Sequence, residues 1–350
     1  MARTAYNTEL QPYRVTVVIP TLSADHTLWD CVDGLHRQTY RDFCIVIVDN
    51  SGSRRVEQNW PIETSRQGVA VLHPGVNTGF GAAVNLAARE ALADFVAVIN
   101  DDAVASPDWL NELVSALDHH PEAGSAASQV RLHGVENALD SAGMLIAADG
   151  TSKQRGHGQP PESFAQPCEV LLASGSASIY RQTMLTQTGG FDDSFFLYCE
   201  DTDLGLRARW AGWTCRYVPS AVVHHRYSHS AGRASKLKAY FVERNRLLLI
   251  AKTFPLTRIF RALIATPVRY FHHLLAMRRG QGAAAHFQQD GESAWTLVAC
   301  VLRAHLAAAA RLPKLCRQRR AIQRSAKITP AEFQSALNRF SISLRQVAQL

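Results

Sequence analysis

The chain has 350 residues, of which 47% are apolar, enough for one substantial core with roughly a hundred residues left over. Its net charge of +7 is uneven, because 15 Lys and Arg meet only three Asp and Glu after Pro255, against 22 and 27 up to that point. This asymmetry predicts a basic C-terminal appendage that meets an anionic surface, either membrane lipid or nucleic acid.

The cysteines and the N-terminal sequence indicate in which cellular compartment the protein is expected. The seven cysteines are scattered and form no Cys-x-x-Cys pair, which argues against a zinc or dithiol site and for buried thiols in a reducing environment. Residues 1–14 are polar and lack the basic start and apolar stretch of a secretory signal. We therefore expect a cytoplasmic protein.

The first half alternates short β-branched runs with segments of helical spacing. The predicted strands are Val15–Ile19, Cys44–Val48, Val69–Leu72 and Phe95–Ile99. The predicted helices between and after them are Thr27–Arg37, Gly81–Leu92 and Pro107–His119, the last with Ser106 as its cap. This order predicts an α/β fold with a mostly parallel, Rossmann-like sheet sandwiched by helices.

In an open parallel sheet, ligands bind beyond the carboxyl ends of the strands. The segments that follow the four strands are polar, acidic or rich in glycine: Pro20-Thr21, Asp49-Asn50-Ser51, 74–81 and Asn100-Asp101-Asp102. Any one of these is often an ordinary turn, but their coincidence at four strand ends predicts a binding site.

Asn100, Asp101 and Asp102 offer hard oxygen ligands at the lip of the sheet, which suit Mg²⁺ or Mn²⁺. Such an ion would neutralise the charge that develops on a departing diphosphate. The alternative is an Asx turn that leads into the helix after Ser106.

Two further segments suggest contacts with a nucleotide. Asp49 is an acceptor for the N–H groups of a pyrimidine, and small polar residues follow it. The glycines of residues 75–81 allow backbone to approach a ligand closely. A dehydrogenase fingerprint would have its glycines directly after the first strand, where this chain has Pro20-Thr21, so that function is disfavoured.

Carboxylates and histidines gather later in the chain. Glu200 and Asp201 fall in the first turn of a predicted helix, and one of them is expected to accept a proton from a hydroxyl that attacks. Simple helix capping is the alternative. His224 follows the strand-like run Ala221-Val222-Val223 and is a candidate to complete the metal site, although a lone histidine is more often structural.

Residues 14–255 closely resemble the family-2 glycosyltransferases, inverting enzymes of the GT-A fold, and in particular their rhamnosyltransferase-like members. The motifs that carry the resemblance are 17–21, 48–50, Asn77-Thr78-Gly79-Phe80-Gly81 with Asn85, 100–102, 189–192 and 200–204. The resemblance implies a GT-A catalytic domain at 14–255, with a nucleotide-sugar-binding half at 14–102 and an acceptor half at 103–255. A tail at 1–13 would precede it, and a basic helical appendage at 256–350 would follow.

The family resemblance also implies roles for single residues. It puts the nucleotide near Thr21 and Asp49, the metal on Asp102, and the catalytic base at Asp201, while His224 matches the family's late histidine. The substrate-binding set that it suggests is Pro20, Thr21, Asp49, Asn50, Ser51, Asn77, Gly79, Phe80, Gly81, Asn85, Asp101, Gly175 and Arg181, with Glu200 beside the base.

Two departures from the family pattern concern the acceptor. The family's double arginine is Arg181-Gln182 here, in the strand after the loop 173–176, which leaves the acceptor contacts open. The Gln-x-x-Arg-Trp motif of processive members is missing, because 207–210 reads Arg-Ala-Arg-Trp. We therefore expect one sugar to be transferred per encounter. The family resemblance implies that this sugar comes from a nucleoside-diphosphate sugar, with dTDP-L-rhamnose favoured, and is used in the synthesis of a bacterial surface glycan.

The appendage and the rival functions complete the expectations. Leu256–Met277 and Ser293–Leu312 are apolar but interrupted by arginines, which predicts amphipathic helices at the inner leaflet of the plasma membrane. The expected partners are anionic lipid and a polyprenyl-linked acceptor. Nucleic acid is not expected as a partner. An ordinary basic helical subdomain is the alternative. The rival functions are a nucleotidyltransferase of sugar phosphates and a non-catalytic, membrane-associated scaffold that binds sugar nucleotides.

Overall fold

A computed structural model of the chain describes residues 13–226, 235–282, 285, 287 and 293–349. Contacts within the chain divide it into two compact units, which are described separately. Unit 1 comprises residues up to 143 together with 154–196 and 213–227, and unit 2 comprises 144–153, 197–212 and 228–350. The predicted boundary at residue 255 does not coincide with this division, because residues 144–153, 197–212 and 228–255 group with the C-terminal helices.

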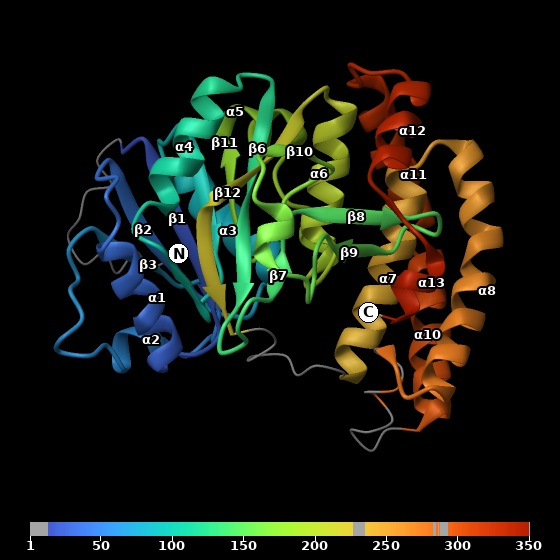
Figure 1. Cartoon of the computed structure of the whole chain (residues 1–350), viewed down its shortest axis with the longest axis horizontal. Helices are drawn as coiled ribbons and strands as arrows, with labels where there is room; N and C mark the ends of the chain where they lie inside the picture. Colours follow the sequence, from blue (N-terminus) through green and yellow to red (C-terminus); the bar gives the residue numbers. More distant parts are fainter. Residues whose placement is uncertain (1–12, 227–234, 283–284, 286, 288–292, 350) are drawn as a thin grey trace. The chain divides into compact units, whose positions relative to one another are not determined.

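Unit 1 is built on a ten-stranded mixed sheet (Figure 1). Its strands are β1 (Val15–Thr21), β2 (Phe43–Asp49), β3 (Val69–Leu72), β4 (Phe95–Ile99), β5 (Ala103–Ala105), β6 (Ala123–Leu132), β7 (Leu139–Ser141), β10 (Cys168–Val170), β11 (Ala177–Arg181) and β12 (Thr214–His225). The main order is β10-β12-β6-β11-β4-β1-β2-β3. The β4-β1-β2-β3 part is parallel, and β11 lies antiparallel to both β4 and β6. The predicted parallel sheet is thus confirmed for the first half of the chain.

Helices cover both faces of this sheet (Figure 1). They are α1 (His26–His36), α2 (Arg55–Gln58), α3 (Phe80–Glu90), α4 (Trp109–His119) and α5 (Gln182–Thr188), with single 3-10 turns at Pro161–Phe164 and Asp193–Phe195. Val15, Val17 and Ile19 point to the face that packs on α1 and α4, because alternate residues of a strand face opposite ways. Both faces of β1 are buried, as its unbroken apolar sequence predicts.

The predicted strands and helices of residues 15–119 are confirmed, with ends that shift by a residue or two. The exception is the start of α4. Ser106 does not cap this helix; Asp108 is its first flanking residue, and no side chain there makes a capping hydrogen bond. The backbone carbonyl of Ser106 instead accepts hydrogen bonds from Trp109 and from the side chain of Gln38.

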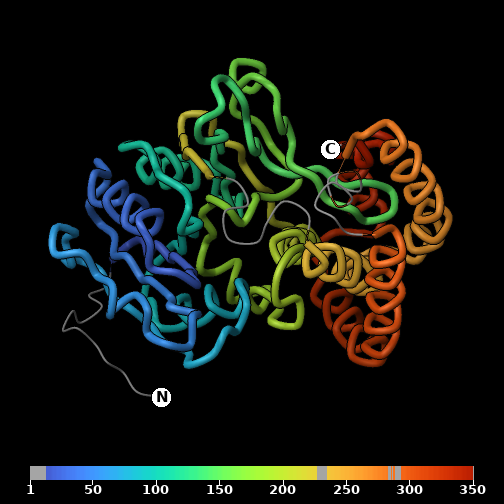
Figure 2. The backbone as a smooth tube through the Cα atoms, turned by 90° about the horizontal axis from the view of Figure 1, so that it is seen from below, coloured from blue at the N-terminus to red at the C-terminus, as the bar shows by residue number. Residues whose placement is uncertain are grey.

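Unit 2 combines a small sheet with a group of helices. These helices are coloured from yellow-green to red in Figure 2. Its strands are β8 (Met144–Ala147), β9 (Ser152–Gln154) and β13 (Ser341–Ile342), in the order β13-β8-β9. Its helices are α6 (Glu200–Trp210), α7 (Lys236–Thr253), α8 (Leu256–Arg278), α10 (Ala294–Ala309), α11 (Leu312–Arg324), α12 (Pro330–Arg339) and α13 (Leu344–Gln349). The two helices predicted in the C-terminal appendage therefore form, as α8 and α10.

Candidate active site

The carboxyl ends of β1, β2 and β4 meet at one edge of the sheet in unit 1. Thr21 pairs with Asp49 across the parallel β1–β2 ladder, and the backbone N–H of Asn50 donates to the carbonyl of Thr21 at 2.8 Å. Asn100 directly follows β4, the other neighbour of β1. The segments that the sequence singled out at these strand ends thus lie on one edge.

Asp101 is fixed at this edge by Thr21, whose hydroxyl donates to its carboxylate at 2.6 Å. Burial raises the pKa of Asp101 from 3.8 to about 6; the hydrogen bond from Thr21 opposes this, and the charges of Asp102 and Asp25 add to it. Three aspartates therefore repel one another at the end of the sheet. A bound cation would relieve that repulsion.

Asp102 begins a buried chain of alternating carboxylates and imidazoles. Its Oδ1 lies 3.1 Å from Nε2 of His225, whose Nδ1 lies 2.7 Å from Oδ2 of Asp140. The other oxygen of Asp140 is 3.3 Å from Nδ1 of His157. Burial alone would lower the pKa of His225, but the two carboxylates raise it to about 10, so His225 is a cation at neutral pH.

His225, not His224, is the histidine that contacts Asp102. His224 is exposed on the opposite face of β12, and partial loss of solvent around its ring, together with the positive charges of Arg131 and His133, lowers its pKa. The reason is the two-residue period of a strand, which turns the neighbours 224 and 225 to opposite faces. His225 therefore replaces His224 in the assignment proposed below.

His225, Asp140 and His157 are functional candidates that the sequence did not single out. The signal for His225 was the buried, apolar Val223 two positions earlier, which shares its face. Asp140 and His157 gave no such signal, since they lie 85 and 68 residues before His225 in short or irregular segments. Only the fold brings them together.

The Asp49 segment folds onto itself. The two carboxylate oxygens of Asp49 accept the backbone N–H groups of Ser51 and Val56, each at 3.0 Å, and the side chain is 1% exposed. The amide of Asn50 donates to the carbonyl of Gly79 and accepts from Thr78. Asp49 and Asn50 thus shape the loops at this edge, and Pro20 lies beside them within β1.

Gly79 and Gly81, at the start of α3, serve close packing within unit 1. A Cβ atom on Gly79 would overlap the backbone of Phe196, whose carbonyl accepts the N–H of Phe80 at 2.9 Å, and one on Gly81 would meet the Cβ of Phe191 at 2.8 Å. The N–H of Gly79 donates to the side chain of Asn77 at 2.9 Å. Their lack of a side chain is therefore explained without a ligand.

Asn85 joins the same packed region. Its amide exchanges two hydrogen bonds with the backbone of Phe191, at 2.8 and 2.9 Å, and donates to Asp193. A Cβ on Gly190, which has a φ of +70°, would meet the Asn85 side chain at 2.5 Å. Asn85 thus fixes the segment 190–193.

Gly175 and Arg181 lie at opposite ends of the sheet. The carbonyl of Ser176, next to Gly175, accepts the N–H of Asn100 at 2.9 Å, which puts the loop 173–176 at the edge with Asp101. Arg181 pairs with Phe95 at the amino end of β4, and its guanidinium donates to the carbonyls of Ala123 and Leu117. Arg181 is therefore left out of the site proposed below.

In unit 2, the three carboxylates at the start of α6 have three different environments. Asp203 is fully buried in ion pairs with Arg207 and Lys252, at 2.7 and 2.9 Å. Glu200 is buried, and burial together with the charge of Asp201 raises its pKa from 4.5 to about 8, so that it is mostly neutral at pH 7. Asp201 accepts hydrogen bonds from the backbone and hydroxyl of Thr202.

Within the described residues, no group of three or more His, Cys, Asp and Glu side chains is arranged to hold a metal ion alone. Asp101 and Asp102 nevertheless fit a divalent cation, since they are adjacent, hard oxygen donors in a region of repelling negative charge, Asp102 buried and Asp101 half-buried. The remaining ligands would have to come from substrate or water.

Comparisons with known proteins agree with this geometry. The family model described as Glycosyl transferase family 2 matches residues 16–189. An N-acetylglucosaminyl-diphospho-decaprenol L-rhamnosyltransferase of Mycobacterium tuberculosis is 30% identical over 253 residues, which cover 64% of this chain and 80% of that protein. The O-antigen chain rhamnosyltransferase RfbN of Salmonella typhimurium is 22% identical over 65% of this chain and 70% of its own length.

Solved structures share the fold. GalNAc-T7, crystallised with UDP, GalNAc and Mn²⁺, superposes with a TM-score of 0.56 over 78% of this chain and 51% of its own, at 14% identity. The mannosyltransferase PcManGT from Pyrobaculum calidifontis, in complex with GDP-Man and Mn²⁺, gives 0.50 over 87% of this chain and 88% of its own, at 16% identity. The predicted GT-A fold is confirmed, and the chain belongs to glycosyltransferase family 2.

Proposed function

We propose that this family-2 glycosyltransferase is a metal-dependent, inverting enzyme of bacterial surface-glycan synthesis. In this proposal it moves one sugar, with dTDP-L-rhamnose as the favoured donor, to a hydroxyl of a lipid-linked glycan. The observation that carries the proposal is the edge of the sheet where Thr21 contacts Asp101 and His225 contacts the neighbouring Asp102. The rhamnosyltransferases among its relatives support the choice of donor.

Asp102, with Asp101 beside it, is the proposed binding site for Mg²⁺ or Mn²⁺. When bound, such an ion supplies positive charge that stabilises the nucleoside diphosphate as it leaves. His225 holds the Asp102 carboxylate in place, because it is itself fixed from the other side by Asp140. Thr21 does the same for Asp101.

Asp201 is the proposed general base. It would take the proton of the acceptor hydroxyl as that oxygen forms a bond to the anomeric carbon, while the bond from this carbon to the diphosphate oxygen breaks on the opposite face. The configuration therefore inverts, and the nucleoside diphosphate leaves with the bonding electrons. Glu200 is unsuited to this role at neutral pH, because its raised pKa keeps it protonated.

A lipid-linked acceptor agrees with the surface of α8 and α10. Apolar side chains that are 42–82% exposed recur along both helices: Leu256, Phe260, Leu263, Ile264, Val268, Phe271 and Leu274 on α8, and Trp295, Val298, Leu302 and Leu306 on α10. Together with the basic charge after Pro255, these side chains suit an anionic bilayer surface. We therefore propose that the protein is cytoplasmic and binds peripherally to the inner face of the plasma membrane.

Among the described helices, none is by itself both long enough and apolar enough to cross a bilayer. Helices α10 and α11, bent by 62° at their junction, meet the length and composition requirements only as a pair.

The test of the proposed activity is a panel of nucleotide sugars incubated with and without Mn²⁺. Release of nucleoside diphosphate, fastest from one donor and dependent on the metal, is the expected result. Formation or consumption of inorganic pyrophosphate would instead identify a nucleotidyltransferase. Absence of any turnover with measurable donor binding would identify a scaffold.

The membrane proposal is tested by co-sedimentation with phosphatidylcholine vesicles that contain or lack phosphatidylglycerol. The protein is expected to pellet with the anionic vesicles, and Ile264→Glu, at a residue that is 72% exposed, should weaken this binding. The matched control is Ile62→Glu, since Ile62 is fully exposed but belongs to unit 1. Equal binding by all three proteins would overturn the proposal.

A further inference from the structure

Four consecutive residues of α7 are buried although all four are polar or charged. Glu243, Arg244, Asn245 and Arg246 are 4%, 5%, 0% and 1% exposed. Four residues exceed one helical turn, so their side chains point in all directions around the helix. Burial of such groups is costly unless each finds a partner, and their partners therefore show what α7 holds in place.

Asn245 holds the segment that leads into α6. Its side-chain amide donates to the carbonyls of Leu197 and Tyr198, at 2.8 and 2.7 Å, and its oxygen accepts from Nε of Arg244 at 2.8 Å. Tyr198 and Cys199 have φ values of +68° and +64°, a left-handed conformation that non-glycine residues adopt at a cost. One buried amide thus fixes two carbonyls of a strained turn.

Asp201 lies two residues beyond that turn. Cys199 flanks the N-terminus of α6 without a side-chain capping hydrogen bond, so the helix is not oriented there by its own cap. The direction in which the first turn of α6 projects its carboxylates therefore depends on the conformation of residues 197–199. Asn245 sets that conformation.

The other side of this first turn is held by the β8–β9 turn. The hydroxyl of Thr202 donates to Oγ of Ser152 at 2.9 Å. Within the turn, the Asp149 carboxylate accepts from the backbone and hydroxyl of Thr151. The start of α6 is thus anchored to a turn that has its own internal bonds.

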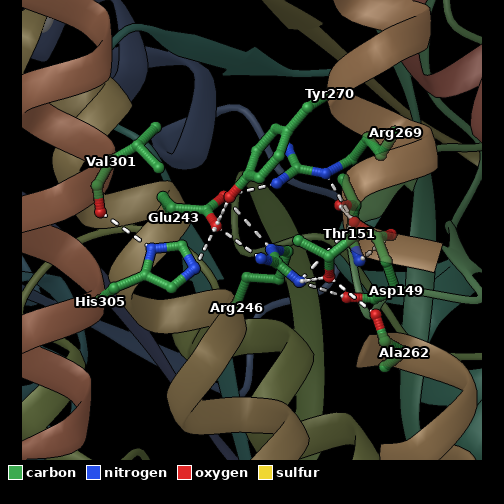
Figure 3. A network of polar contacts seen from close by, with 10 residues as sticks. Asp149, Thr151, Glu243, Arg246, Ala262, Arg269, Tyr270, Val301 and His305 are labelled. Atoms are coloured by element: carbon green, nitrogen blue, oxygen red, sulfur yellow. Dashed lines mark hydrogen bonds and ion pairs between the residues drawn. The ribbon is translucent and has the colours of Figure 1, made fainter. Parts of the chain in front are cut away.

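Helices α7 and α8 clamp that turn through two arginines (Figure 3). Arg246 donates to the carbonyl of Asp149 at 2.7 Å, and Nε of Arg269 lies 2.6 Å from the Asp149 carboxylate. Glu243 bridges both arginines, at 2.5 and 2.6 Å, and also accepts from Tyr270. Burial alone would raise the pKa of Glu243, but the guanidinium groups of Arg246 and Arg269 hold it far below its usual value, so Glu243 stays ionised.

We propose that Asn245 is a positioning residue for the transfer reaction, which acts by fixing the 197–199 turn and thereby the Asp201 carboxylate. This inference rests on the proposed role of Asp201 as the base. A misplacement of a reacting group by about 1 Å lowers rates on the order of 100-fold, so the loss of this amide should act on turnover more than on donor binding.

The test is Asn245→Asp, which keeps the shape and the oxygen that accepts from Arg244 but removes both N–H donors to the carbonyls. We expect kcat to fall about 100-fold, with KM for the donor within a factor of about two. Asn245→Ala should likewise lower kcat and leave KM for the donor nearly unchanged. The matched control is Thr253→Val, a substitution at another buried position of α7 that removes a hydroxyl bonded only to the helix backbone.

The Thr253→Val variant separates positioning from stability. It is expected to lower the free energy of unfolding while kcat stays within a factor of about two. If Thr253→Val loses kcat to the same extent as Asn245→Asp, or if folded Asn245→Asp turns over normally, the positioning role is overturned.

Asp201→Asn, measured in parallel, separates this inference from the proposed function. If it keeps near-normal turnover, the base assignment fails, and the positioning role fails with it. If it abolishes turnover while both Asn245 variants remain active, only the positioning role fails. Loss of kcat in both sets, with the Thr253 control active, supports the two together.

Discussion

The acidic residues at the sheet edge of unit 1 and those at the start of α6 in unit 2 lie in different environments. At the sheet edge of unit 1, Asp101 and Asp102 lie side by side, and the positive charge that faces them comes from His225. On α6 of unit 2, Glu200 is neutral because it carries a proton. Asp203 is neutralised by ion pairs with Arg207 and Lys252. The first arrangement suits a cation, and the second leaves Asp201 for proton transfer.

The lesson of this comparison is that residue type alone does not assign a role. Glu200, Asp201 and Asp203 are neighbours on one helical turn, yet burial without a cation raises the pKa of Glu200, while Asp203 faces Arg207 and Lys252. Substitutions at residues of the same type should therefore have different effects on activity and stability.

The largest expected effect distinguishes Asp201 from Glu200. Asp201→Asn should lower kcat about 10³-fold, within the range that general bases contribute, and leave donor binding intact. Glu200→Gln should stay within a factor of about three at pH 7, because glutamine mimics the neutral acid. Steady-state kinetics with an acceptor glycan measure both. Equal losses in the two variants would contradict the division of roles on α6.

The next effect distinguishes His225 from His224. His225→Ala removes the cation that lies between the buried carboxylates of Asp102 and Asp140, which should cost about 3–5 kcal/mol in the free energy of unfolding. His224→Ala removes an exposed side chain and should change it by about 0.5 kcal/mol or less. Urea denaturation gives both values. Similar costs would mean that His225 is not the residue that balances this charge.

A smaller effect is expected for metal binding at the sheet edge. Asp102→Asn should weaken donor binding about 10- to 100-fold with Mn²⁺ present and leave binding without metal nearly unchanged. Asp118→Asn is the control, since Asp118 is exposed on α4 and pairs with Arg14. Calorimetry with and without the metal measures both variants. The same affinity in wild type and Asp102→Asn would remove Asp102 from the cation site.

The sheet edge was predictable because local sequence specifies most of it. The strands up to Phe95–Ile99 are largely apolar runs that the sequence makes recognisable. In a parallel sheet their carboxyl ends lie at the same edge, so Thr21 and Asp101 could be predicted to lie close together. Arg181 was misassigned because β11 runs antiparallel to β4, which carries its end to the opposite edge. Strand direction is not visible in the residues of β11 themselves.

The supports of both sites were not predictable from sequence. The register of β12 shifts between Val218 and Val222, so the faces of His224 and His225 could not be counted from the start of the strand. The run Glu243–Arg246 has the composition of a solvated helix face, yet it is buried. Its partners lie 26 and 97 residues away, at Arg269 and Asp149, and only tertiary contact reveals them.

The last expected effect is a gradual change of stability with pH, and it concerns the proton on Glu200. The folded protein holds this proton up to about pH 8, whereas the usual pKa is 4.5, so between these values the folded state binds more protons than the unfolded state. Stability must then fall as the pH rises, by at most about 1.4 kcal/mol per pH unit from this group. Glu200→Gln has no proton to lose and should lack this contribution.

The measurement is the free energy of unfolding of wild type and Glu200→Gln at several pH values from 5 to 9. The variant should gain stability relative to wild type with each step up to about pH 8 and then hold that gain, because Glu200 is ionised in both states of the wild type above its folded pKa. A difference that stays constant across the range would mean that Glu200 is already charged at neutral pH. Two adjacent carboxylates would then be ionised at the start of α6, and Glu200 would compete with Asp201 for the role of base.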